Sequence, residues 1–138
     1  MTKSTHLIGG LALGLALPSG DLRLALGLAV VAGFGALVPD FDLRVGLPHR
    51  GVTHSLLALG LVALLAFHGL PLLVALALVG GYGSHLVLDS LTVSGVPLLW
   101  PLRFRFKLAR FVTGHLGDRL LGACLSLCAV WLVVRGLV

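Results

Sequence analysis

Four histidines and three aspartates in this sequence have the residue types and the spacing of metal ligands. They fall in four short polar stretches, "STHL" near the N-terminus, "VPDFD", "HRGVTHS" and "GSHLVLDS". The set is His6, Asp40, Asp42, His49, His54, His85 and Asp89. Neutral imidazoles and carboxylates together suit Zn²⁺, with Mn²⁺ or Fe²⁺ as alternatives. The set would hold one ion or two, and its four histidines with several carboxylates would suit two ions better than one.

The spacing of these residues favours a shared site. His85 and Asp89 are four residues apart, so on a helix they lie on one face. Asp40 and Asp42 follow Pro39, which should end a helix and leave both carboxylates in a loop. His49 and His54 lie on either side of the entry to the next expected span, which begins near residue 53.

Each residue also has a structural alternative. His6 could be an interfacial residue, Asp40 or Asp42 could shape the turn after Pro39, and Thr53 or Ser55 could cap the next helix. His85 with Asp89 could be a buried hydrogen-bonded pair. The occurrence of all seven residues together favours the metal site.

The surrounding sequence is that of a membrane protein. Of 138 residues, 58% are hydrophobic and 11% are charged, and the mean hydropathy is +1.10. Apolar runs of this kind cross a bilayer as helices. We expect an all-α, polytopic membrane helix bundle of about five transmembrane helices, with four as the alternative, forming a single integral membrane domain over residues 1–138. The expected spans are approximately 5–18, 21–38, 53–68, 71–92 and 118–137.

Five spans would bring all seven candidate ligands to one membrane face. Seven of the ten lysines and arginines fall on the same face: Lys3, Arg44, Arg50, Arg103, Arg105, Lys107 and Arg110. The positive-inside rule makes that face cytoplasmic, with the N-terminus on the same side. We therefore expect a multi-pass protein of a bacterial or archaeal inner membrane with its metal site at the cytoplasmic end.

The net charge, the N-terminal run and the basic segment say less about the function than the candidate ligands do. A net charge of +5 is better explained by topology and by contact with anionic lipids than by nucleic-acid binding. The N-terminal run resembles a signal peptide, but Pro18 stands where a small residue is wanted, so we expect it to be a retained span. The basic segment 102–119 would attract lipid head groups or only set topology, and the oligomeric state is open.

The polar motifs resemble one known family. In this order, "VPDFD", "HRGVTHS" and "GSHLVLDSLTVSGVPLLWP" are similar to the motifs of the LexA-regulated, membrane-bound metal-dependent hydrolases, the YdjM-like proteins. That family is in turn similar to zinc-dependent phospholipase C-like proteins. The resemblance covers residues 5 to about 101, and it implies a hydrolase in which the seven histidines and aspartates bind metal.

These observations lead to a hypothesis for the function. A metal-activated water would hydrolyse a phosphoester bond in a lipid or amphiphile, with an anionic phospholipid as the expected substrate. Arg50 would bind the phosphate, Thr53 would donate to an oxygen or orient a ligand, and Asp42 or Asp89 would act as general base. The alternatives are a metal-ion transporter and a non-catalytic membrane protein with a structural metal.

Overall fold

The computed structural model describes residues 1–46 and 48–136, and α-helices dominate this part of the chain. Two short 3₁₀ helices, η1 (Pro39–Leu43) and η2 (Val52–His54), accompany them. The five α-helices of the described residues are α1 (Lys3–Leu15), α2 (Leu22–Gly35), α3 (Leu56–Gly69), α4 (Leu72–Ser90) and α5 (Leu116–Arg135). The predicted all-α fold is confirmed. Each predicted span contains most of one helix, and the last residue of span 118–137 lies outside the described residues.

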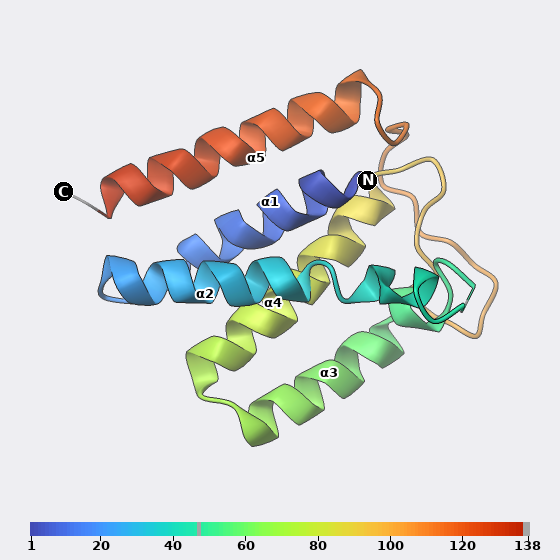
Figure 1. The fold of residues 1–138 in the computed structure, drawn as a ribbon. Coiled ribbons are helices and arrows are strands. Elements are labelled where there is room, and N and C mark those ends of the chain that lie inside the picture. The colour runs from blue at the N-terminus through green and yellow to red at the C-terminus, as the bar shows by residue number, and fades with distance from the viewer. Residues whose placement is uncertain (47, 137–138) are drawn as a thin grey trace.

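Local sequence signals set the helix starts. The side chains of Thr2, Asp21 and Ser55 accept hydrogen bonds from the backbone N–H groups three residues later, at 3.4, 2.9 and 3.2 Å. These side chains satisfy N–H groups that have no partner inside the first helical turn. Because the caps fix where α1 and α3 begin, the polar residues beside Thr2 and Ser55 take defined positions at one end of the bundle, whereas Asp21 caps α2 at the other end (Figure 1).

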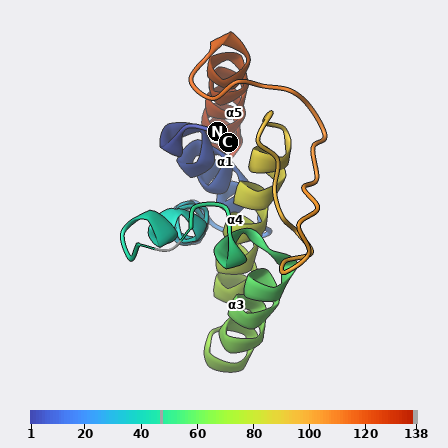
Figure 2. The same cartoon turned by 90° about the vertical axis from the view of Figure 1, so that its right-hand side faces the viewer.

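Three helices form the centre of the bundle. Helix α1 packs against α2, α4 and α5, and α2 also packs against α4, while α3 packs on α4. Figure 1 shows α5 and α3 on opposite sides of this centre. In both views the start of α1, the end of α2, the start of α3 and the end of α4 meet at one end (Figures 1 and 2).

The helices approach closely because small residues lie where they cross. A methyl group on Gly81 of α4 would collide with the backbone carbonyl of Ala32 in α2. A methyl group on Gly10 of α1 would lie 2.5 Å from the oxygen of that carbonyl. Close backbone approach at small residues is typical of helices packed in membranes.

The surface is apolar and the interior at the meeting end is polar. Large side chains on α2, α3 and α5 point outward, among them Val30, Phe34, Leu57, Leu127 and Trp131. His6, His54, His85, Asp42 and Asp89 are buried. In the part of the chain that the structure describes, α4 and α5 are long and apolar enough to cross a membrane, and α2 and α3 are shorter apolar helices. Helices α1 to α3 have only 13 or 14 residues, because the ends of the predicted spans lie in turns.

A long connection joins α4 to α5. Residues 91–115 pass over the meeting end of the bundle (Figure 2). Two backbone hydrogen bonds between Val96 and Phe106 fix its course. Val96 N donates to Phe106 O at 3.0 Å, and Phe106 N donates to Val96 O at 2.9 Å.

Candidate metal centre

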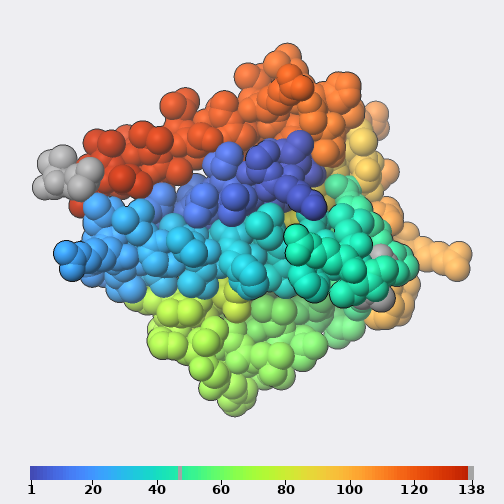
Figure 3. Space-filling model, in the orientation of Figure 1, coloured from blue at the N-terminus to red at the C-terminus, as the bar shows by residue number. Residues whose placement is uncertain are grey.

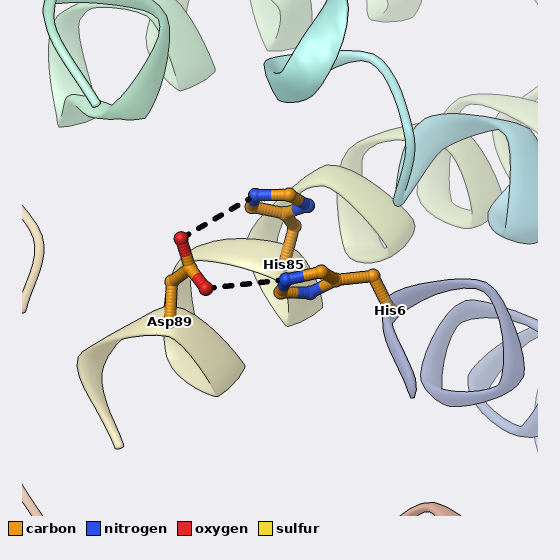
Figure 4. A group of neighbouring side chains, drawn as sticks. All are labelled: His6, His85 and Asp89. Atoms are coloured by element: carbon orange, nitrogen blue, oxygen red, sulfur yellow. Dashed lines mark hydrogen bonds and ion pairs between the residues drawn. The ribbon is translucent and has the colours of Figure 1, made fainter. Parts of the chain in front are cut away.

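All seven predicted ligands lie together where the helices meet. Three groups have ligand atoms within 4.8 Å of one another: His6, His85 and Asp89; Asp40, His54 and His85; and Asp42, His49 and His54. His6 comes from α1, His85 and Asp89 from α4, and the other four from the segment between α2 and α3. Figure 4 shows the first group, in which one oxygen of Asp89 faces each histidine ring.

Four ligand atoms form a small cage at the centre of this cluster. The Nε2 atoms of His54 and His85 are 3.2 Å apart. Asp40 Oδ1 lies 3.7 and 3.6 Å from these two nitrogens, and Asp89 Oδ2 lies 3.8 Å from each. Ligands about 2.0–2.1 Å from a tetrahedral Zn²⁺ are about 3.3–3.4 Å apart. The two histidine nitrogens and either carboxylate oxygen therefore form a triangle whose sides, 3.2–3.8 Å, are close to the edges of such a tetrahedron.

The hydrogen bonds of His85 direct its Nε2 into the cage. Its Nδ1 lies 2.7 Å from the carbonyl oxygen of Ala36. Because a carbonyl only accepts, Nδ1 must carry the proton, and in a neutral imidazole Nε2 then presents a lone pair. A histidine held in this way by a backbone carbonyl is a common arrangement for a metal ligand.

The same reasoning fixes the tautomer of His54. The hydroxyl of Thr53 donates to Asp42 Oδ2 at 3.0 Å, so its oxygen can only accept from His54 Nδ1, which is 2.9 Å away. His54 Nδ1 is therefore protonated and its Nε2 also presents a lone pair. Two lone pairs and two carboxylate oxygens therefore lie around the contact between His54 and His85, and a cation bound beside it would offset their repulsion.

Asp89 divides its two oxygens between different partners. While Oδ2 faces the cage, Oδ1 lies 2.5 Å from the amino group of Met1, 2.9 Å from Arg50 Nη2 and 3.2 Å from His6 Nε2. Arg50 also donates through Nη1 to Thr92 at 2.9 Å. The guanidinium predicted to bind phosphate is therefore bonded to a candidate metal ligand and to the end of α4.

His6 lies beside the cage. Its ring stacks on that of His85, with centroids 3.7 Å apart. Its Nδ1 is buried and has no hydrogen-bond partner among the described residues. The stacked pair leaves His6 facing Asp89 and fixes the position of the His85 ring.

The outer side of the cluster is more accessible. The side chain of His49 is 39% exposed, and its Nδ1 lies 3.2 Å from Asp42 Oδ1. Asp40 is 12% exposed.

One supporting residue, Asp118, has no clear signal in the sequence. Asp118, at the start of α5, is buried and accepts from Thr5 Oγ1 at 2.6 Å, from Gly114 N at 2.7 Å and from Thr2 N at 3.0 Å. It ties α5 to the start of α1, one residue from His6. An aspartate at the edge of an apolar run was the only available signal. The other two histidines, His68 and His115, are exposed and belong to none of the three groups.

The apolar exterior, the close helix packing and the buried histidine and aspartate cluster define a small helical membrane protein with a candidate metal site. The chain matches the YdjM inner membrane protein family over residues 1–137. It belongs to that family.

Individual relatives agree with this assignment. The chain is 45% identical over 94 residues to the inner membrane protein YdjM of Escherichia coli (strain K12), covering 61% of this chain and 47% of that protein. The YdjM protein of Shigella flexneri gives the same values. The uncharacterized protein YvsG of Bacillus subtilis (strain 168) is 30% identical over 149 residues, covering 95% of this chain and 93% of that protein. The chain thus matches about half the length of the two YdjM proteins, and no solved structure matches it.

Proposed function

We propose that this protein is a metal-dependent hydrolase of the inner membrane that cleaves a phosphoester bond in a lipid or amphiphile. The observation that carries the proposal is the cage of His54, His85, Asp40 and Asp89, in which one oxygen of each carboxylate lies 3.6–3.8 Å from both histidine Nε2 atoms. Mixed imidazole and carboxylate ligands favour Zn²⁺, with Mn²⁺ and Fe²⁺ as alternatives. One ion fits the cage better than two, because Asp89 Oδ1 is already bonded to three other groups.

The donor set suits a catalytic site as well as a structural one. A divalent cation held there would polarise a phosphoryl oxygen and make water more acidic. Asp40 lines a cavity at the side of the bundle, so substrate would approach the cage from that side.

In the proposed reaction, the residues around the cage would accept a proton, orient the histidines and balance the charge of Asp89. His49 would accept the proton of the attacking water, since its ring is accessible and Asp42 lies against its Nδ1. Asp42 would orient His49 and, together with Thr53, His54. Arg50 would balance the charge of Asp89, with its partners set by Thr92.

The proposal also includes an orientation of the protein in the membrane. The chain would form one integral domain with its N-terminus and its site on the cytoplasmic side. The family membership, the outward apolar side chains and the position of the basic residues support this topology. Helices α1 to α3 would then lie in the bilayer as short or tilted segments with their flanking turns.

Hydrolysis by detergent-purified protein tests the proposal. Wild type loaded with Zn²⁺ would be given phosphatidic acid, phosphatidylglycerol and phosphatidylethanolamine in mixed micelles, before and after EDTA. We expect turnover of at least one lipid, lost on chelation and in His85→Ala. His49→Ala should keep its metal but lose turnover. Turnover that survives both EDTA and His54→Ala, or no turnover by protein with a full complement of metal, would contradict the proposal.

A further inference from the structure

A second feature lies directly beside the cage. A cavity of about 500 Å³ opens between the start of α1, the end of α2 and η1. Its apolar wall is formed by Phe34, Leu37, Val38 and Phe41, and its polar rim by Lys3, Asp40 and Arg44. Figure 3 shows the face where the first residues of α1 lie against the end of α2 and the segment that follows.

The cavity combines a hydrocarbon surface with positive charge. Phe34 and Phe41 are 66% and 55% exposed, so the cavity is open to the surroundings of the bundle. The guanidinium of Arg44 lies over the ring of Phe41, 5.7 Å from its centroid. The cation is therefore held beside the apolar wall, as an amphiphile with a charged head would require.

Asp40 connects the cavity to the cage. It lines the cavity, and its Oδ1 is 3.6 Å from the Nε2 of His85. Because Oδ1 of this carboxylate faces the histidines of the cage, Lys3 and Arg44 are the two charges of the rim that remain for a ligand. Both are cations, so an anionic head group has complementary partners and a neutral one does not.

We propose that this cavity binds one anionic phospholipid, with its head group at Lys3 and Arg44 and one of its acyl chains on Phe34, Leu37 and Phe41. The volume lies within the range of small-molecule sites. The inference that this lipid is the substrate rests on the proposed hydrolase function. The inference that the cavity binds the lipid does not. A phosphate at the rim would lie next to the cage, and the chain would remain in the hydrocarbon layer.

Equilibrium binding tests the cavity apart from catalysis. Protein in neutral detergent with EDTA would be titrated with fluorescently labelled dioleoyl phosphatidylglycerol and with dioleoyl phosphatidylcholine carrying the same label. We expect wild type to prefer the anionic lipid by about tenfold or more, since each surface cation contributes measurably to such binding. The variant Lys3→Gln with Arg44→Gln should lose that preference. Phe41→Ala should weaken binding of both lipids.

A matched control removes the same charge elsewhere. Arg103→Gln with Arg105→Gln also deletes two exposed cations, on the connection between α4 and α5, and should keep the preference. Preference lost in this control but kept in the Lys3 and Arg44 variant would place anionic lipid on the connection and overturn the inference. Equal binding of both lipids by wild type would also overturn it, as would binding of neither, the result for a cavity covered by a second copy. Because EDTA is present throughout, these results do not depend on the metal or on hydrolysis.

Discussion

The two halves of the histidine and aspartate cluster are built differently. The helix half, His6, His85 and Asp89, lies on α1 and α4 and is buried, with Asp89 tied to Met1 and Arg50. The loop half, Asp40, Asp42, His49 and His54, lies on η1, η2 and the residues between them, and His49 is partly exposed. In the proposed hydrolase, helix packing would position His85 and Asp89, while the loop half would complete the cage with Asp40 and His54 and would provide access and proton transfer through His49.

Removing a charge from the helix half should have the largest effect. Asp89→Asn leaves Arg50 and the Met1 amino group without their buried carboxylate, and breaking such a pair costs about 3–5 kcal/mol. Unfolding by denaturing detergent measures the free energy. Asp21→Asn is the control, since Asp21 is an exposed helix cap. A loss below about 1 kcal/mol for Asp89→Asn would contradict the difference between the halves.

Separating α2 from α4 should disturb the helix half without touching a ligand. Gly81 lies one turn before His85, and Gly81→Ala would push α4 away from Ala32 at a cost of about 1–3 kcal/mol. His85 would lose its hydrogen bond to Ala36, so metal affinity should fall as well. Gly83→Ala is the control, because a methyl group there meets open space. Equal stability of the two variants would mean that helix packing does not position His85.

Within the loop half, Asp42 should matter through the histidines that it orients. Asp42→Asn weakens the bonds to Thr53 and His49, and loss of such partners typically reduces metal affinity about 10- to 100-fold. Competition with a chelator of known affinity measures this change. Affinity equal to that of wild type would show that Thr53 alone is enough to orient His54.

The smallest effect on metal binding should come from His49. It lies outside the four-atom cage, so His49→Ala should change metal affinity by less than about tenfold, whereas turnover should fall by about 100-fold or more. Parallel metal and rate measurements separate these effects. A loss of metal as large as that in His85→Ala would make His49 a ligand instead of a proton acceptor.

Much of this arrangement follows from local sequence. The four-residue spacing of His85 and Asp89 predicts a helical pair, which is observed in α4. Pro39 does follow the end of α2, but Asp40, which was predicted in a loop, lies on the short 3₁₀ helix η1. Apolar runs separated by turn residues predict the five helices. These features depend on neighbouring residues, so the sequence alone can reveal them.

Other parts of the site depend on contacts between distant segments. The carbonyl of Ala36 binds His85 across 49 positions, and any residue could supply a carbonyl. Arg50 was expected to bind phosphate, yet its guanidinium bonds to Asp89 and Thr92. Asp118 binds Thr5 at the start of α1, more than 100 residues away. Hydrophobic patterning carries no information about such polar partners.

The central claim is that His54 and His85 hold a metal ion together. Metal content measured by mass spectrometry on detergent-purified protein tests it most directly, with wild type beside His54→Ala, His85→Ala and the control His68→Ala, which changes an exposed histidine. The account predicts stoichiometric metal in wild type and His68→Ala and its loss in the other two variants. No metal in wild type after supplementation with Zn²⁺, Mn²⁺ and Fe²⁺, or unchanged metal in His54→Ala and His85→Ala, would contradict it.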